Sequence, residues 1–408
     1  MIRADQLRRL SITVLAVLTI AVGAAQLVST PDDHPAGPGG EPAARAADPS
    51  AADPVVAPAG TTAPGGAVGD VTPGPAEDGT GPAPAGGSDA GTADRPPGSI
   101  TLAFAGDVNF AERTADRLAA DPARVFGAAA SGLAAADLTM VNLETAIATG
   151  GEPEPKSFTF RAPPAALDAL RAAGIDVASM ANNHAADYGA TGIAQSLAAI
   201  GSSGFPVIGF GADHASAVAP YEAVVGGVPV SVFAASQVPD RTLAVWTATA
   251  TTPGIAAADD PQLVEAVRAA AQAGRTVVVF LHWGTEYVSC PDPDQQRLAD
   301  QLAAAGATAV IGSHAHVLQG AGWRSDGSYV AYGLSNYLWW RSFGNEQDDN
   351  GILTLTISDR RVVAADFAPA HLDGTGVPVP ATGDERDRID RQWDRVRRCA
   401  GLAAEPPR

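Results

Sequence analysis

Aspartate, asparagine, glutamate and histidine side chains gather at points of this 408-residue chain where apolar runs end. The clusters are residues 106–109 (Gly-Asp-Val-Asn), 142–144 (Asn-Leu-Glu), 182–184 (Asn-Asn-His), 282–286 (His-Trp-Gly-Thr-Glu) and 313–316 (Ser-His-Ala-His). Carboxylate, amide and imidazole ligands together suit Zn, Mn or Fe in a hydrolytic site of one or two ions, whereas Ca²⁺ prefers oxygen ligands alone. The clusters contain four of the seven histidines and neither cysteine. The sequence therefore predicts a divalent transition-metal centre without thiolate ligands.

The most specific of these signals is the pair His314 and His316, separated by one residue at the end of an apolar run. In an extended backbone, residues i and i+2 point to the same face, so both imidazoles are expected to reach one centre. Gly312, which precedes the pair, allows the backbone to approach closely. A single aspartate after a strand is most often a turn or helix cap, so the metal prediction rests on the conjunction of the clusters.

The apolar runs predict the elements that must position these side chains. Strands are expected at residues 99–105, 138–143, 175–180, 221–225, 229–234, 276–281, 307–311, 329–334, 352–357 and 361–368. Helices are expected at residues 165–173, 192–202, 261–273 and 295–305, with a further candidate at 384–399. Alternating strands and helices followed by a strand-rich part predict an α/β sandwich with mixed sheets. Ligands bind at the carboxyl ends of strands in such sheets, so five strand ends could place metal ligands around one point.

The N-terminal segment has the pattern of a membrane signal. Arginines at positions 3, 8 and 9 precede an apolar run over residues 10–28, long enough to span a bilayer, and they predict an exported body. We expect residues 1–29 to be a signal anchor that makes this a single-pass cell-membrane protein with an extracellular domain. Cleavage of a signal peptide, giving a secreted protein, is the alternative. Residues 30–98, rich in Pro, Gly and Ala, are predicted to be a disordered linker, followed by the body at 99–373 and a C-terminal extension at 374–408.

Charge and cysteine content restrict the partners. The formal net charge is −19, which argues against nucleic acid because phosphate backbones need a basic surface. An anionic substrate would have to be held by a local metal or arginine, and Arg161 and Arg341 are the candidates for substrate binding. Cys290 and Cys399 are too few for a disulfide scaffold. In an exported body they could pair with each other, and two free thiols are the equal alternative.

Seven segments of the body resemble the CapA family of poly-γ-glutamate capsule biosynthesis proteins, which is related to the calcineurin-like metallophosphatases. They are residues 104–109 (Phe-Ala-Gly-Asp-Val-Asn), 142–144 (Asn-Leu-Glu), 170–176 (Leu-Arg-Ala-Ala-Gly-Ile-Asp), 181–189 (Ala-Asn-Asn-His-Ala-Ala-Asp-Tyr-Gly), 282–287 (His-Trp-Gly-Thr-Glu-Tyr), 312–319 (Gly-Ser-His-Ala-His-Val-Leu-Gln) and 332–337 (Tyr-Gly-Leu-Ser-Asn-Tyr). The segments Asn-Asn-His and His-Trp-Gly-x-Glu-Tyr are the most specific. The resemblance extends from about residue 99 to about residue 373.

This resemblance implies a metallophosphatase-like αββα sandwich and a role for each site residue. The implied metal ligands are Asp107, Asn109, Glu144, Asn183, His282, His314 and His316. Glu144 corresponds to a carboxylate that bridges two metals, and Asp107 to the ligand from the first strand, so both are implied in catalysis. His184 resembles the histidine that protonates the leaving group. Asn109 is a departure, because metallophosphatases carry the histidine of an Asp-x-His motif at that position.

Two functions follow from these expectations. The first is an exported, membrane-tethered, metal-dependent hydrolase that cleaves a phosphoester or an amide in the synthesis or processing of a poly-γ-glutamate-like capsule or cell-envelope polymer. The second is a non-hydrolytic, metal-binding component of a membrane complex that assembles or exports such a polymer. The expected substrate is an anionic polymer or a small ester or amide. A binding module with a degenerate site is disfavoured by the nearly complete ligand set.

Overall fold

The computed structural model describes residues 95–408 of the chain. The predicted signal anchor lies outside these residues, as does all of the predicted linker before residue 95. Among the helices of the described part, none combines the length and the apolar content that a bilayer crossing requires.

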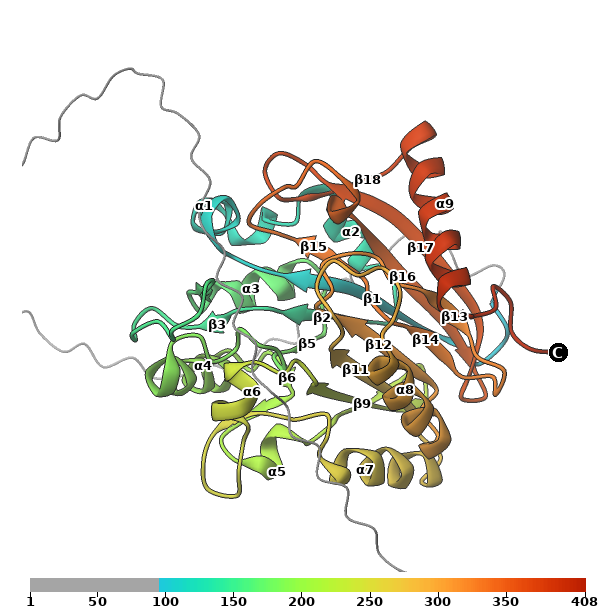
Figure 1. The fold of residues 1–408 in the computed structure, drawn as a ribbon, viewed down its shortest axis with the longest axis horizontal. Coiled ribbons are helices and arrows are strands. Elements are labelled where there is room, and N and C mark those ends of the chain that lie inside the picture. The colour runs from blue at the N-terminus through green and yellow to red at the C-terminus, as the bar shows by residue number, and fades with distance from the viewer. Residues whose placement is uncertain (1–94) are drawn as a thin grey trace, which may run out of the picture. The chain divides into compact units, whose positions relative to one another are not determined.

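Two mixed β-sheets lie at the centre of the described part (Figure 1). The first has eight strands, in the order β18-β17-β16-β1-β2-β5-β6, with β15 also paired to β1. Their bounds are Ile100–Val108 (β1), Leu138–Leu143 (β2), Val177–Ser179 (β5), Val207–Ile208 (β6), Asn336–Leu338 (β15), Asp349–Ser358 (β16), Arg361–Leu372 (β17) and Pro378–Pro380 (β18). Strands β1, β2, β5, β6 and β15 pair in parallel, whereas β16, β17 and β18 add an antiparallel part.

The second sheet has six strands, in the order β13-β14-β12-β11-β9-β8. Their bounds are Tyr221–Val225 (β8), Val228–Ser236 (β9), Thr276–His282 (β11), Ala309–Ser313 (β12), Ala321–Trp323 (β13) and Tyr329–Ala331 (β14). The four central strands are parallel, and an antiparallel strand closes each edge. Two further pairs of short strands lie outside these sheets: Ala146–Ile147 (β3) with Arg161–Ala162 (β4), and Phe210–Gly211 (β7) with Gly254–Ile255 (β10).

Helices cover the outer faces of both sheets, so the chain forms a four-layer α/β sandwich. The main ones are Glu112–Ala120 (α1), Ala165–Ala172 (α3) and Gly189–Ser203 (α4) on the first sheet, and Pro261–Gln272 (α7) and Pro293–Ala305 (α8) on the second. Side-chain alternation in β1 explains the layers: Phe104 packs with Phe280 between the sheets, whereas Ala105 packs with Leu170 and Ile193 under the helices. The predicted mixed α/β sandwich is confirmed.

Most predicted strands and helices are present, with shifted ends. Strand β1 continues to Val108, so Asp107 lies inside the strand rather than after it. The prediction of one strand over residues 329–334 is wrong at its end, because β14 stops at Ala331 and the chain crosses to the other sheet. There β15 pairs with β1, after a turn at Ser335 with a φ of 63°. Helix α1 and the short helices Ala130–Leu133 (α2), His214–Ala217 (α5) and Arg241–Trp246 (α6) have no counterpart in the sequence prediction.

The C-terminal helix Gly383–Cys399 (α9) packs against the first sheet beside β17 (Figure 1). Its apolar stripe includes Trp393, whose ring stacks on Phe367 with centroids 3.9 Å apart. A disulfide joins Cys399, the last residue of α9, to Cys290, with Cα atoms 5.7 Å apart. Of the two alternatives that the sequence left open, the structure therefore shows the paired cysteines.

Candidate metal centre

The carboxyl ends of strands from both sheets meet at one point. In the first sheet Asp107 of β1 stands in register with Asn142 of β2 and with Asn336 of β15. In the second sheet His282, the last residue of β11, is in register with Ser313 at the end of β12. The side chains of the two sheets touch: Asn142 Nδ2 lies 3.2 Å from His282 Nδ1. The predicted convergence of strand ends is present.

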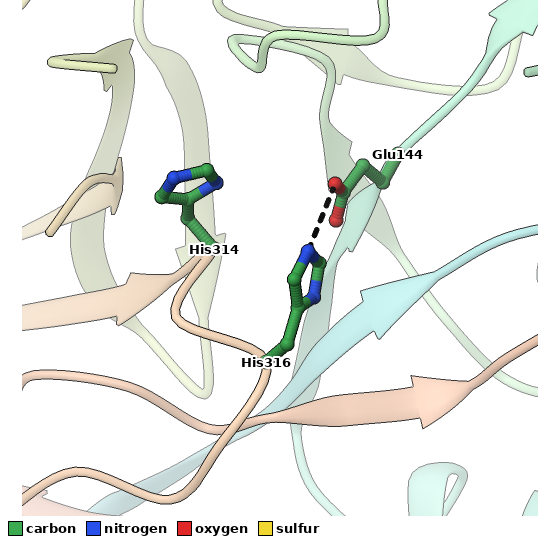
Figure 2. Close-up of side chains that lie close together, drawn as sticks. All are labelled: Glu144, His314 and His316. Carbon is green, nitrogen blue, oxygen red and sulfur yellow. Dashed lines mark ion pairs between the residues drawn. The ribbon is translucent and has the colours of Figure 1, made fainter. Parts of the chain in front are cut away.

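Glu144 occupies the middle of this group. Its Oε1 lies 3.8 Å from His184 Nε2, 3.8 Å from His282 Nε2 and 3.9 Å from His316 Nε2. Figure 2 shows Glu144 directed at His316, with His314 close by. Two sets of three ligand atoms each lie within 4.8 Å of one another, Glu144 with His314 and His316, and Glu144 with Asp107 and His282. A carboxylate common to both sets is the arrangement expected of a ligand shared between two ions.

The polar atoms left without partners fit a cation in this place. Glu144 Oε1, His314 Nδ1 and Asn109 Oδ1 are buried and have no hydrogen-bond partner among the described residues. A buried polar atom without a partner costs about 1–3 kcal/mol, so these three need an explanation. Oxygen and imidazole nitrogen are the donor types of zinc, manganese and iron sites. The residues present therefore fit one or two divalent transition-metal ions.

The backbone at the two histidines differs from the prediction. His314 has a φ of 94° and His316 a φ of 54°, so both lie in the left-handed region and the segment is a turn, not a continuation of the strand. The prediction that both imidazoles reach one centre is confirmed. The predicted cause, alternation of side chains along an extended strand, is wrong, because a turn brings them together. Left-handed residues other than glycine cost on the order of 1–3 kcal/mol, and such strain is typical of functional sites. The turn also brings the His314 backbone N–H to within 3.3 Å of Asp107 Oδ2.

Close packing explains two glycines that precede site residues. A Cβ atom on Gly312 would lie 2.1 Å from both Trp283 Nε1 and the carbonyl oxygen of Tyr332. A Cβ atom on Gly106 would lie 1.8 Å from the carbonyl oxygen of Ser335. Side chains at these positions would push β12 and β1 away from their neighbours and displace the ligands that follow. The expected close approach of the backbone at Gly312 is confirmed.

Amide side chains fix the orientation of the carboxylate and imidazole groups. Asn142 Nδ2 donates to Asp107 Oδ1 at 2.8 Å, and Asn182 Nδ2 donates to Asn142 Oδ1 at 3.0 Å. The Oδ1 of Asn183, an expected ligand, lies 2.8 Å from His282 Nε2. Partners of this kind set the tautomer and the direction of a ligating ring.

Two positioning side chains escaped the sequence analysis. Asn336 places its Oδ1 2.8 Å from His316 Nδ1. Its signal was its place in the segment of residues 332–337, which the resemblance had matched without giving it a role. Lys156 lies in a loop, and its one sequence signal is that it is the only lysine of the chain.

His184 is held by a charged pair on the side away from Glu144. Its Nδ1 lies 2.5 Å from Asp187 Oδ2, and Asp187 Oδ1 lies 2.8 Å from Lys156 Nζ. Lys156 also donates to the carbonyl oxygen of Asn183. The Phe160 ring packs on the imidazole with centroids 4.4 Å apart. With Nδ1 fixed in this way, Nε2 faces the centre, as a proton donor to a leaving group requires.

Burial and neighbouring charges shift the pKa values of the ligands. Burial raises the pKa of Glu144 well above its usual range, and the charge of Asp107 raises it further. Burial alone would raise the pKa of Asp107, but interactions with His316 and Asn142 lower it overall. Burial, then the charge of His316, lowers the pKa of His314 to about 3. Burial likewise lowers the pKa of His282. Burial also lowers the pKa of His184, although the charge of Asp187 acts to raise it. The lowered pKa values of His282 and His314 favour the neutral imidazole, which is the form that binds a metal ion.

The two arginines proposed for substrate binding lie outside both ligand sets. Arg161, at the start of β4, is exposed, and its guanidinium carbon lies 4.6 Å from the centre of the Tyr188 ring. Arg341 lies in the loop after β15, with its guanidinium carbon 4.7 Å from the Trp340 ring. Their role in substrate binding stays a prediction.

Comparison with known proteins identifies sequence relatives. The family model "Bacterial capsule synthesis protein PGA_cap" matches residues 101–339. "Capsule biosynthesis protein CapA" of Bacillus anthracis is 28% identical over 242 residues, which are 58% of this chain and 57% of that protein. "PGA biosynthesis protein CapA" of Bacillus subtilis (strain 168) is 29% identical over 181 residues, 44% of this chain and 46% of that protein. A "probable polyglutamine synthesis accessory protein" of Mycobacterium tuberculosis is 32% identical over 195 residues, 45% of this chain and 50% of that protein. The chain spans about half the length of these relatives.

Solved structures with a related chain trace are more distant. A hypothetical protein from Thermus thermophilus is 18% identical, with a TM-score of 0.42, over 66% of this chain and 98% of that chain. The NAD nucleotidase of Haemophilus influenzae is 13% identical, with a TM-score of 0.42, over 75% of this chain and 58% of that chain. At this level of similarity no function is transferred from either protein.

Proposed function

The chain belongs to the bacterial capsule synthesis protein family, and from this membership we propose that it is a metal-dependent hydrolase acting on a capsule or cell-envelope polymer. The observation that carries the proposal is the position of Glu144, which has a buried, unpartnered oxygen and belongs to both sets of ligand atoms. Asp107 and His282 complete one set, and His314 and His316 the other.

The chain's own residues supply the remaining parts of a hydrolytic reaction. The two sets of side chains around Glu144 would hold a divalent cation, which would supply Lewis-acid chemistry for the scissile group and for a water nucleophile. His184 Nε2, on the same side as Glu144 Oε1, is placed to donate a proton to the leaving group. Asp187 holds the opposite ring nitrogen and so keeps the proton-donating nitrogen directed at the centre. Asn142 keeps Asp107 in place.

The substrate class is proposed from the relatives, whose names refer to capsule, PGA and polyglutamine synthesis. We propose a poly-γ-glutamate-like polymer, cleaved at an amide or at a phosphoester of a precursor. The disulfide between Cys290 and Cys399 supports an exported body, because disulfides persist in oxidising compartments. Attachment to the cell membrane through residues 1–29 is part of the same proposal.

A non-hydrolytic role in polymer assembly is the second candidate. The name of the mycobacterial relative, a synthesis accessory protein, favours it. In that role the ion would hold an anionic polymer without cleaving it, as part of a membrane complex. The two candidates differ in one observable, turnover by the metal-loaded protein.

The test compares the full-length protein, purified in detergent, with a variant carrying His314→Ala and His316→Ala. Metal content is measured after loading with Mn²⁺, Zn²⁺ or Fe²⁺, and turnover is measured with bis(p-nitrophenyl) phosphate and with γ-linked glutamate oligomers. His371→Ala is the matched control, since His371 Nδ1 pairs with Glu385 at 3.0 Å, outside both ligand sets.

We expect stoichiometric metal and turnover in the parent and the control, and loss of both in the double variant. Metal without turnover of either substrate class would favour the assembly role. If the parent protein binds no metal, both the hydrolase role and the assembly role are excluded, because each uses the ion.

A further inference from the structure

Two loops beside the metal centre carry side chains that the ligand sets do not use. The loop after β11 holds Tyr287, whose backbone N–H donates to the carbonyl oxygen of Ala315 at 2.7 Å, between the two histidines of the turn. The Tyr287 ring lies 6.0 Å from the His316 ring. The loop after β15 holds Arg341 and Phe343, and the Phe343 ring lies 6.4 Å from that of Tyr287. The two loops therefore meet directly beside His316.

Aromatic rings surround the guanidinium of Arg341. Its central carbon lies 4.5 Å from the ring of Phe343, 4.7 Å from that of Trp340 and 5.5 Å from that of Phe158. Contact with ring faces orients a guanidinium and leaves its N–H edge for other partners. Burial raises the pKa of the Tyr287 hydroxyl and the charge of the neighbouring Glu286 raises it further, whereas the charge of Arg341 lowers it. Arg341 is therefore held by two rings of its own loop and by Phe158.

The guanidinium of Arg341 has no carboxylate partner among the described residues. No ion pair there joins Arg341 to a carboxylate, and its Nε is buried without a hydrogen-bond partner. Arg388 and Arg395, which approach the same loop from α9, are paired at 2.6 Å with Asp349 and at 2.7 Å with Glu346. An oriented guanidinium without a carboxylate partner is suited to bind an oxyanion through paired hydrogen bonds.

Apolar side chains border this guanidinium on the surface. Phe158 is 50% exposed, Tyr287 44% and Val288 42%, and these are among the most exposed large apolar side chains of the described part. Exposed apolar groups of this kind mark binding surfaces when they gather in one place. Here they lie beside a cationic group and a metal centre, so the surface offers contacts to both charged and methylene parts of a ligand.

We propose that Arg341 and Tyr287 form a binding subsite for a side-chain carboxylate of a polyanionic chain whose backbone is held at the metal centre. This inference rests on the proposed function, because it concerns the substrate of the same site. The protein as a whole is acidic, with a net charge of −19, and repels a polyanion at long range. Arg341 supplies the local positive charge, and the rings around it contact the methylene groups between successive carboxylates.

Helix α9 and its contacts hold both loops in position. The disulfide between Cys290 and Cys399 ties the Tyr287 loop to the end of the helix. The ion pairs of Arg388 and Arg395 tie the Arg341 loop to the same helix. Within that loop, the Asp348 carboxylate accepts the Phe343 backbone N–H at 2.8 Å. Because these loops are fixed before the ligand arrives, binding requires little ordering of the subsite.

The test measures binding of a short γ-linked glutamate oligomer to the Mn²⁺-loaded full-length protein by titration calorimetry. Arg341→Gln is compared with Arg171→Gln, a matched control whose guanidinium also lies over an aromatic ring, 5.7 Å from Phe205, outside the two loops. We expect Arg341→Gln to weaken binding about tenfold to a hundredfold, as loss of a charge-assisted hydrogen bond implies. The control should bind as the parent does. An oligomer of γ-linked isoglutamine, in which a carboxamide replaces each free α-carboxylate, should bind the parent as weakly as the glutamate oligomer binds Arg341→Gln.

Equal affinity of Arg341→Gln and the control for the glutamate oligomer would overturn the subsite. If Arg341→Gln does not fold, Arg341→Lys is used instead, because it keeps the charge and loses the paired N–H groups. An unchanged affinity of Arg341→Lys for the glutamate oligomer would overturn the paired hydrogen bonds. Failure of the hydrolase proposal is distinguishable, since the oligomer would then bind in an Arg341-dependent way without being cleaved. Failure of the subsite alone would leave turnover of bis(p-nitrophenyl) phosphate in place while the oligomer binds Arg341→Gln as tightly as the parent.

Discussion

Asn109 donates its Nδ2 to the backbone carbonyl of Glu144 at 2.9 Å, across 35 residues of sequence, and keeps its own buried Oδ1 without a partner. The asparagine replaces the histidine that the resemblance to metallophosphatases leads one to expect. It fixes the backbone of the carboxylate common to both ligand sets, and it leaves an amide oxygen free to act as a ligand. The departure from the expected motif is therefore compatible with metal binding.

Changing Asn109→Ala should affect both stability and metal affinity. The variant leaves the Glu144 carbonyl buried and unpaired, which should lower the free energy of unfolding of the metal-free protein by about 1–3 kcal/mol. It also removes the amide oxygen, so metal affinity should fall, as it does when outer partners of ligands are lost. Chemical unfolding with chelator and metal titration measure the two effects.

Asn350→Ala is the matched control for this prediction. Asn350 is also fully buried, donates its Nδ2 to the Asp348 carbonyl at 3.0 Å and has an unpartnered Oδ1, but it lies away from the ligand sets. This control should lose a similar amount of stability and keep the metal affinity of the parent. Equal metal affinity in both variants would exclude a role for Asn109 at the centre.

Asp187 should act on turnover through His184. In Asp187→Asn the group 2.5 Å from His184 Nδ1 loses its charge, so the imidazole is less firmly held in the orientation that donates a proton. We expect kcat to fall roughly tenfold to a hundredfold, with KM and metal content little changed. Asp240→Asn is the control, because Asp240 pairs with Lys156 at 3.3 Å and does not touch His184. A parallel loss of metal in Asp187→Asn would point to a structural role instead.

The pH dependence of stability in the metal-free protein should reveal the buried His314. Its pKa falls from 6.5 to about 3 on folding, so below about pH 6.5 the unfolded state binds the additional proton. The free energy of unfolding should therefore decrease as pH falls from about 7 to about 5, on the order of a few kcal/mol from this group.

Glu144 acts in the opposite sense over the same range, because its raised pKa makes the folded state bind a proton that the unfolded state releases. The measurement is therefore a difference: urea unfolding of the parent and of His314→Gln, both with chelator, at each pH. The variant should lose less stability on acidification than the parent. If the free energy of unfolding depends on pH in the same way in both proteins, His314 is not buried in its neutral form.

The sequence was sufficient for the long strands of both sheets and for most of the polar residues that converge at the candidate centre, for a physical reason. Strands that are buried on both faces, such as β11, appear as continuous apolar runs, and their carboxyl ends must meet when they are parallel. Asp107, Glu144 and His282 could therefore be found as polar residues at the ends of such runs.

Local patterns could not reveal features that depend on contacts between distant segments. The left-handed turn at His314 follows from contacts with β1, and the passage of the chain from β14 to β15 joins two different sheets. Lys156 has no neighbour in sequence that marks it, and its role appears only through its contact with Asp187. The sequence of α9 is mostly polar, so it does not reveal the buried apolar stripe of this helix or its contacts with two loops.

The disulfide between Cys290 and Cys399 should stabilise the protein and position a loop without contributing to metal binding. The double variant Cys290→Ser and Cys399→Ser removes a cross-link between residues 109 positions apart, which typically lowers the free energy of unfolding by about 2–4 kcal/mol. Metal content should be unchanged, because the candidate ligands lie at the carboxyl ends of strands β1, β2, β11 and β12. Binding of the glutamate oligomer should weaken, since the loop carrying Tyr287 loses its tie to α9. In the parent, a thiol assay on unfolded protein without reductant should find no free cysteine, and two titratable thiols there would contradict the pairing.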